Sequence, residues 1–349
     1  MYNPNLYSRR AFLSSSARVV GGLTLVSAVP IFSACGGGGG TVAGTVGSVF
    51  NWVPDIEWSA WYLGEEKGYF AERNVTSELI HGGPNTPAVV QVIAGGDGQV
   101  GLSASELDII RANQEGSDYV VFAAMYQRNP LGYTWLATTE INSAEDLIGK
   151  RIGAPQGDQV QIEAVFKIND LPVDYVFVPM SFDPQPLVDG EMDVIVSYVT
   201  NQPIQLELAG HEVKSAPYSD FGLPSYGDIL FASKAWIAEN RDLLVQYTAA
   251  LLSGVDDNRA DPMEVIPILV EKYGADAEIN EEYAVAANPA YIALMDSDFT
   301  DANGLLSVDP DKMGNEILPG LVAAGETELP TVEEFLDTSI LKDAHAARA

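Results

Sequence analysis

The sequence predicts an α/β protein built from two lobes. From Val46 onward, short apolar runs alternate with stretches of helical pattern, and this alternation is typical of α/β rather than all-β proteins. About 310 residues follow the N-terminal leader, which is enough for two lobes of ordinary domain size. No repeat of about 20–50 residues is visible, so the chain is not a solenoid.

The first 34 residues are predicted to be a twin-arginine lipoprotein signal peptide. SRRAFL at residues 8–13 is an export pattern, and the apolar run 19–32 is too short to span a membrane. Small residues then lead to Cys35, the only cysteine, in an arrangement that resembles a bacterial lipobox. We therefore expect Cys35 to carry a lipid that anchors the exported protein to the outer face of the cell membrane, and residues 35–46 to form a glycine-rich tether. An ordinary signal-region cysteine is the alternative.

The composition limits the partners and the chemistry. The chain has a net charge of −31, and removing the predicted signal peptide, which holds three arginines and no acidic residue, leaves −34. Such a surface repels nucleic acid, so no nucleic-acid partner is expected. With no cysteine beyond Cys35, the lobes hold no disulfide, no multi-cysteine metal site and no thiol nucleophile. We predict no metal and no cofactor.

The first lobe is predicted from residues 47–137 and 229–349, and its C-terminal part is mostly helical. Its strands are expected at residues 48–53, 77–81, 100–103, 119–126, 133–137 and 229–232. Its helices are expected at residues 59–67, 87–94, 106–114, 234–239, 241–255, 262–273, 281–295 and 312–323.

The second lobe is predicted from residues 138–228. Its strands are expected at residues 150–153, 174–179, 193–198 and 212–216. Its helices are expected at residues 142–147, 159–168, 184–188 and 203–209. Two segments then cross between the lobes, and a cleft between such lobes is the usual place for a small-molecule site.

Six short motifs carry a family resemblance when they are taken in order. They are EEKGYF at 65–70, GGDGQVG at 95–101, EDLIGKRIG at 145–153, LVDGEMD at 187–193, NQPIQL at 201–206 and FGLPSY at 221–226. Over roughly residues 48–290 the chain resembles the solute-binding proteins of vitamin and sulfonate ABC transporters. That family includes sulfonate-binding, thiamine-pyrimidine-precursor-binding and riboflavin-binding proteins.

The resemblance implies a type II periplasmic-binding-protein fold, with two crossover segments and a helical C-terminal layer on the first lobe. It also implies a monomeric, lipid-anchored protein that captures a small molecule between its lobes and delivers it to a permease and its ATPase. A ligand that contacts both lobes binds the closed form better and so shifts the protein toward closure.

The same resemblance implies which residues line the cleft. Trp52, Glu57 and Trp58 match cleft positions, although many relatives carry Asn and His where this chain has Glu57 and Trp58. Trp61 is expected to be helix core. The ends of the other strands add the polar and aromatic candidates Asn85, Ser105, Glu106, Tyr126, Gln127, Asp158, Asp183, Tyr198, Asn201, Tyr226 and Asp228. Each of these residues fits a helix-capping role as well as a ligand contact.

The chemistry of these loops narrows the ligand. They hold almost no Lys or Arg, with Arg128 the nearest candidate, whereas a sulfonate, nitrate or phosphorylated ligand normally draws arginine or several aligned donors. Aromatic faces together with carboxylates and amides suit an uncharged aromatic vitamin. We expect riboflavin, with a thiamine pyrimidine precursor as the alternative.

Two other classes of function, an enzyme and a ligand sensor, are alternatives to transport. A pyrimidine-synthase-like enzyme on the same fold would need active-site cysteines and a histidine. Here Cys35 belongs to the leader, only His81 and His211 lie within the body of the lobes, and His345 lies in the C-terminal tail. No G-x-S-x-G, H-E-x-x-H or P-loop pattern is present, so no enzymatic activity is expected. A ligand sensor that signals to a protein other than a permease stays open.

Overall fold

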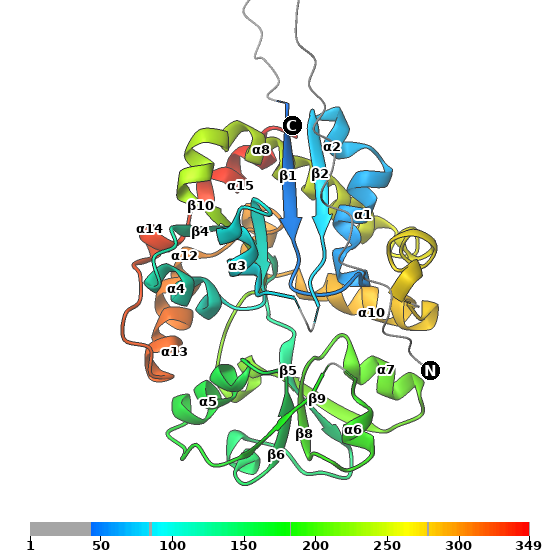
Figure 1. Cartoon of the computed structure of the whole chain (residues 1–349), viewed down its shortest axis with the longest axis vertical. Helices are drawn as coiled ribbons and strands as arrows, with labels where there is room; N and C mark the ends of the chain where they lie inside the picture. Colours follow the sequence, from blue (N-terminus) through cyan, green and yellow to red (C-terminus); the bar gives the residue numbers. More distant parts are fainter. Residues whose placement is uncertain (1–42, 84–85, 182, 278, 349) are drawn as a thin grey trace, which may run out of the picture. The chain divides into compact units, whose positions relative to one another are not determined.

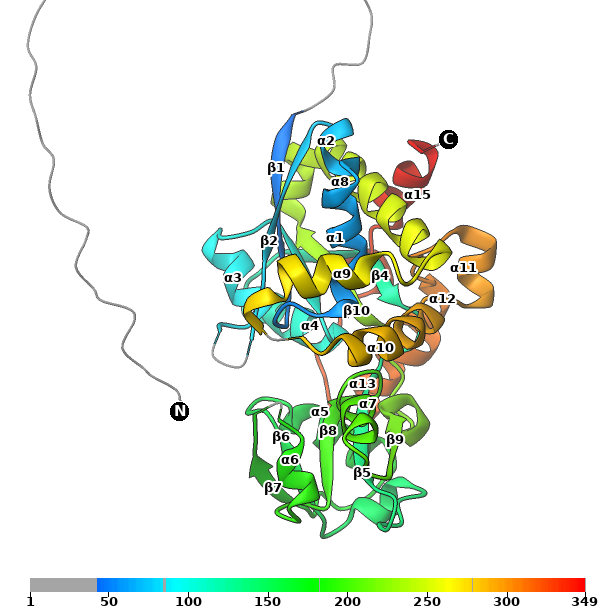
Figure 2. The same ribbon diagram turned by 90° about the vertical axis from the view of Figure 1, so that its right-hand side faces the viewer.

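The structure is a computed structural model that describes residues 43–83, 86–181, 183–277 and 279–348. The predicted signal peptide, Cys35 and most of the predicted tether lie outside the described residues. The described part contains two five-stranded sheets, each covered by helices (Figures 1 and 2), so the predicted α/β class is confirmed. None of its helices combines the length and the apolar character needed to cross a membrane.

The first sheet has the strand order β2-β1-β3-β10-β4 and forms lobe 1 together with the helices on it. Its strands are β1 (Gly44–Val49), β2 (Val75–Ile80), β3 (Val100–Ser103), β4 (Tyr119–Tyr126) and β10 (Gly227–Ser233). Strand β1 runs parallel to β2 and β3, whereas β10 runs antiparallel to β3 and β4. Every residue of β4 is buried, as expected for a continuous apolar run covered on both faces.

Helices of lobe 1 connect the strands of the first sheet. They are η1 (Ile56–Trp58), α1 (Ser59–Glu66), α2 (Tyr69–Glu72), α3 (Val89–Gly95) and α4 (Glu106–Gln114). Helix α1 packs against the long C-terminal helix α8 (Lys234–Ala260). The backbones approach so closely at Gly254 that an added Cβ would lie 2.0 Å from the carbonyl oxygen of Ala60, which explains the glycine there.

The second sheet has the strand order β7-β6-β8-β5-β9 and forms lobe 2. Its strands are β5 (Leu131–Leu136), β6 (Arg151–Ala154), β7 (Val176–Pro179), β8 (Val194–Tyr198) and β9 (Val213–Pro217). Its helices are η2 (Ala144–Leu147), α5 (Gln159–Ile168), α6 (Gln185–Val188), α7 (Gln202–Leu208) and η3 (Tyr218–Phe221). Figure 1 shows this sheet in green, with α5, α6 and α7 around it.

Two of the predicted boundaries are wrong. The strand expected at 133–137 was assigned to lobe 1, but β5 pairs antiparallel with β8 and β9 in the second sheet, so the first crossing comes before Leu131. The tether predicted to end at residue 46 ends earlier, because β1 begins at Gly44, which pairs with Val75 of β2. Both errors come from strand pairing over long sequence separation, which local patterns do not report.

The C-terminal part of the chain is helical, as predicted. Besides α8 it contains α9 (Val265–Ile268), η4 (Leu269–Tyr273), η5 (Ala275–Ala277), α10 (Glu281–Leu294), α11 (Asp298–Asn303), α12 (Pro310–Lys312), η6 (Met313–Ile317), α13 (Leu318–Ala323), α14 (Val332–Phe335) and α15 (Thr338–Ala346). The two helices expected at 234–239 and 241–255 both occur within α8, which is kinked between them at Asn240, where the backbone is non-helical (φ −129°, ψ 23°). The layer is not confined to lobe 1, because α13 packs on α5 of lobe 2 (Figure 2).

Candidate functional site

Three carboxylates are buried close to one another at the ends of lobe 1 strands. Asp55 and Glu57 follow β1 at the start of η1, and each is only 4% exposed. Asp228 lies near the start of β10 and is fully buried. Its φ of 44° is in the left-handed region, where Asp is tolerated better than most residues but still at some cost. The sequence folds this way locally because Asp55 caps η1, accepting a 2.5 Å hydrogen bond from the backbone N–H of Ile56.

Two tyrosines of the C-terminal helix α10 bind these carboxylates. The Tyr283 hydroxyl donates to Asp55 Oδ1 over 2.9 Å, and the Tyr291 hydroxyl donates to Glu57 Oε2 over 3.1 Å. The two residues are eight positions apart, so they share one face of the helix. Helix α10 therefore fixes the orientation of both carboxylates, through one hydrogen bond to each.

Residues of lobe 2 reach the same carboxylates. Asn201, at the N-terminus of α7, donates through Nδ2 to Asp55 Oδ2 over 3.0 Å. Tyr198, at the end of β8, donates through its hydroxyl to Asp228 Oδ1 over 3.1 Å. These two hydrogen bonds join the lobes, so the carboxylates lie at the junction between them.

The environment shifts the pKa values of these three acids upward, toward the protonated form. Burial raises the pKa of Asp55 to about 6 and that of Asp228 to about 7. The pKa of Glu57 lies well above its ordinary range, first because of burial and then because Asp228 and Asp55 are close. None of the ion pairs among the described residues involves any of the three acids.

Four polar atoms at this junction have no hydrogen-bond partner among the described residues. They are Asn51 Oδ1, Glu57 Oε1, Tyr126 Oη and Asp228 Oδ2, and all four are shielded from solvent. Asn51 lies beside Asp228, with its Nδ2 3.5 Å from Oδ1 of that acid. A buried polar group left unpaired costs about 1–3 kcal/mol, so such a set calls for a molecule that satisfies it. Asn51 Oδ1 only accepts hydrogen bonds, the two carboxylate oxygens only accept when their acids are ionised, and the tyrosine hydroxyl can do either.

The structure brings five of the predicted site residues together and places two tryptophans elsewhere. The five are Glu57, Tyr126, Tyr198, Asn201 and Asp228. Trp52 is half-buried and packs against the core of lobe 1. Trp58 was expected in the cleft, but it is fully buried in that core: its ring centroid is 4.5 Å from that of Phe50, and its Nε1 donates to the Val53 carbonyl. It therefore lies with Trp61, as core rather than as a free stacking face.

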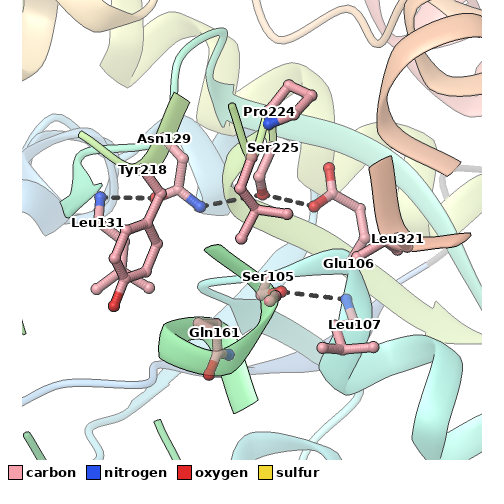
Figure 3. A pocket seen from close by; sticks show the side chains of 12 residues that line it. Ser105, Glu106, Leu107, Asn129, Leu131, Gln161, Tyr218, Pro224, Ser225 and Leu321 are labelled. Atoms are coloured by element: carbon pink, nitrogen blue, oxygen red, sulfur yellow. Dashed lines mark hydrogen bonds between the residues drawn. The ribbon is translucent and has the colours of Figure 1, made fainter. Parts of the chain in front are cut away.

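Ser105 and Glu106 lie at the crossing segments instead. Ser105 caps α4, and Glu106 accepts hydrogen bonds from Ser225 Oγ (2.5 Å) and from the backbone N–H of Tyr226 (2.9 Å). Asn129, on the other crossing segment, donates to Ser225 Oγ over 3.1 Å. A cavity of about 20 Å³ is lined by Ser105, Glu106, Asn129 and Ser225 among others (Figure 3). It has room for about one water molecule and none for a heterocycle.

Two further predicted site residues are held by the C-terminal segment. Gln127 donates through Nε2 to the Ser307 carbonyl, and its own carbonyl accepts from Lys312 Nζ over 2.6 Å. The Lys312 ammonium also lies 4.3 Å from the ring centroid of Tyr226. The side chains of Gln127 and Tyr226 are thereby committed to packing.

Among the described residues, Asp183 and Asp158 of the predicted set are not part of the carboxylate cluster. Asp183 is exposed and caps α6 through the backbone N–H of Gln185. Asp158 is half-buried at the N-terminus of α5 in lobe 2. Asn85 lies outside the described residues.

Sequence reasoning missed four residues of the site: Asn51, Asp55, Tyr283 and Tyr291. Asp55 gave a local signal, because Pro-Asp before a helical pattern is a cap signature. The tyrosines of α10 gave none that pointed to residues more than 200 positions away.

Comparison with known proteins places this architecture in a known class. A ligand-binding component of an ABC-type import system from Staphylococcus aureus superposes with a TM-score of 0.64 at 14% identity, over 87% of this chain and 99% of that chain. The two mixed sheets with their helices have the periplasmic-binding-protein fold.

The sequence comparison then gives the family. A family model described as NMT1/THI5 like matches residues 56–265, more than half of the chain, so the chain belongs to that family. It is 26% identical to the formylaminopyrimidine-binding protein of Halalkalibacterium halodurans, over 85% of this chain and 90% of the relative. It is 23% identical to the riboflavin-binding protein RibY of Chloroflexus aurantiacus, over 77% of this chain and 85% of the relative.

Proposed function

We propose that this protein is the solute-binding component of an ABC importer and that it captures a nitrogen heterocycle of the vitamin type between its lobes. The family, the fold and the names of both curated relatives support this role. The hydrogen bonds from Tyr198 and Asn201 to lobe 1 carboxylates support a site that both lobes share. Because a ligand held there contacts both lobes, it stabilises the closed form that a permease would receive.

We further propose that export and lipid attachment at Cys35 keep the protein at the outer face of the cell membrane. Its partners there would be the permease and its ATPase. Growth of the producing cells with labelled palmitate tests the anchor, because wild-type protein should take up the label and Cys35→Ser should not. Release of the wild-type protein into the medium without label would contradict the anchor and leave the ligand proposal untouched.

Among the candidate ligands, we propose an aminopyrimidine before riboflavin. The observation that carries this ranking is the set of unpartnered acceptors, Glu57 Oε1, Asp228 Oδ2 and Asn51 Oδ1. An aminopyrimidine offers the two N–H groups of its amine, which such acceptors require. The sequence favoured riboflavin because five aromatic side chains were expected to offer free faces to its ring system. Two of these five faces, those of Trp58 and Tyr226, are covered by contacts with Phe50 and Lys312.

Isothermal titration of the mature domain with an aminopyrimidine precursor and with riboflavin tests the proposal. We expect micromolar or tighter binding of the aminopyrimidine and weaker binding of riboflavin. Native mass spectrometry of the freshly purified protein should show a bound heterocycle of the same class. Binding of riboflavin alone would reverse the ranking, and binding of neither compound would refute the proposed ligand class.

We propose binding rather than catalysis. His81 stacks on Phe50 with 4.8 Å between the ring centroids, and burial lowers its pKa to about 4, so it is a neutral packed ring. Recovery of the unchanged compound after denaturation of the complex tests this, and a converted product would contradict it.

A further inference from the structure

We propose, resting on the proposed function, that the site selects a ligand carrying one positive charge and that Glu57 and Asp228 are the charge partners of that ligand. Each of the two carboxylates has one oxygen committed and one free. Glu57 uses Oε2 for Tyr291, and Asp228 uses Oδ1 for Tyr198 and Asn51, which leaves Glu57 Oε1 and Asp228 Oδ2 for the ligand.

A feature other than the acids also marks this place as a binding site. The hydroxyl of Tyr126 is completely buried and has no hydrogen-bond partner among the described residues. Its ring centroid lies 5.5 Å from that of Tyr291, whose hydroxyl donates to Glu57, so Tyr126 lies at the same junction. A tyrosine hydroxyl that only served packing would normally find a partner. Its orphaned state indicates a ligand group between lobe 1 and lobe 2.

No ion pair within the described part of the chain gives these acids a countercharge. Ion pairs among the described residues leave Asp55, Glu57 and Asp228 out, and the groups facing them are tyrosines and amides: Tyr126, Tyr198, Tyr283, Tyr291, Asn51 and Asn201. Buried carboxylates without a cation must take up protons or meet a cation from outside. A cationic ligand satisfies this requirement, whereas a neutral heterocycle leaves the acids to be neutralised by protons.

Protons and a cationic ligand therefore compete for the same two carboxylates. The affinity for a cation should rise with pH as protons leave Glu57 and Asp228, while the affinity for a neutral analogue should fall because ionised acids repel each other around it. One linked proton changes the affinity by at most about tenfold per pH unit. Affinity therefore changes with pH in opposite directions for the cation and for the neutral analogue. This difference distinguishes a charge-selective site from a pocket that recognises shape alone.

A matched pair of compounds tests the inference in the wild-type protein. Aminomethylpyrimidine carries an ammonium group, and its N-formyl derivative has a neutral amide at the same position. We expect isothermal titration to give at least about tenfold tighter binding of the amine near pH 8, with the preference shrinking toward pH 5. Because these measurements need no substitution, they do not depend on a variant folding.

Variants identify the residues responsible. Glu57→Gln and Asp228→Asn should each reduce the preference for the amine at least about tenfold, whereas Asp183→Asn, at an exposed carboxylate outside the cluster, should keep it. Equal or tighter binding of the N-formyl compound at every pH would overturn the inference and leave the proposed function standing. If neither pyrimidine nor riboflavin binds, the proposed function fails and the inference fails with it.

Discussion

Replacing Asp228 with asparagine should make the stability of the ligand-free protein less dependent on pH. Burial raises the pKa of this carboxyl from 3.8 to about 7, so the folded protein holds the proton more tightly than the unfolded chain does. The free energy of unfolding should therefore fall as the pH rises from about 4 to about 7 and level off above that range. In the asparagine variant this part of the pH dependence is absent.

The size of the effect follows from the shift. Three pKa units at about 1.4 kcal/mol each give on the order of 4 kcal/mol, which corresponds to a Tm difference of about 6 °C for about 310 residues at about 2.1 cal/mol/K each. This figure is an upper bound, because opening of the lobes would hydrate the carboxylate without unfolding the chain. Burial raises the pKa of Asp55 to about 6. This acid therefore adds a further fall in the free energy of unfolding as the pH rises, and that fall ends near pH 6.

Thermal unfolding at a series of pH values, in high salt, measures this dependence. Salt screens the repulsion among the many exposed acids but acts much less on a buried group. Asp193→Asn is the matched control, because Arg151 holds the pKa of Asp193 below its ordinary value. That bond contributes stability above pH 4 that is lost as the pH falls further, so its removal should leave the slope between pH 4 and 7 unchanged. Equal slopes for wild type and Asp228→Asn would refute the account of a destabilised buried carboxylate.

Three further predictions concern the lobes and the core. Tyr198→Phe removes a hydrogen bond between the lobes and should weaken ligand binding about 5- to 30-fold in calorimetry with little change in stability; unchanged affinity would show that this bond does not contribute to closure. Trp58→Ala and Trp61→Ala should each lower the free energy of unfolding in urea by about 3–5 kcal/mol, and a loss of binding in Trp58→Ala at unchanged stability would show that Trp58 serves the ligand instead. Glu106→Gln should loosen the crossing segments and raise the radius of gyration of the ligand-free protein in X-ray scattering, whereas an unchanged radius would mean that Glu106 only caps them.

The sequence predicted the elements of both lobes well, because each depends on local pattern. Strands at 100–103 and 119–126 and helices at 106–114 and 159–168 have the predicted bounds. The sheet that contains β5 could not be predicted in this way, since its partners β8 and β9 lie about 60–80 positions further along the chain. Alternation of apolar and polar residues indicates that a segment is a strand, but it does not indicate which strand it pairs with.

The candidate site was predictable only in part, for a related reason. Glu57 was expected because it matches a cleft position of the family, Tyr198 because it ends a strand, and Asp228 because it lies beside the return crossing. Trp58 follows Glu57 directly, and the sequence could not show that its ring turns into the core while the acid turns toward Tyr291 of α10. The outcome depends on packing against Phe50, a tertiary contact between side chains eight residues apart.

Closure of the lobes and the charge of the ligand act through the same residues. The hydrogen bonds that join the lobes end on Asp55 and Asp228, and the repulsion among ionised acids that opposes burial arises from these two groups and Glu57. With protons or a cation present, the acids accept the bonds from Asn201 and Tyr198 without an uncompensated charge between the lobes. Without either, the free-energy cost of burying the ionised acids exceeds the stabilisation from the two hydrogen bonds. The open form is then favoured. A cationic ligand would then close the protein by neutralising the site, which links recognition of the ligand to the conformation offered to the permease.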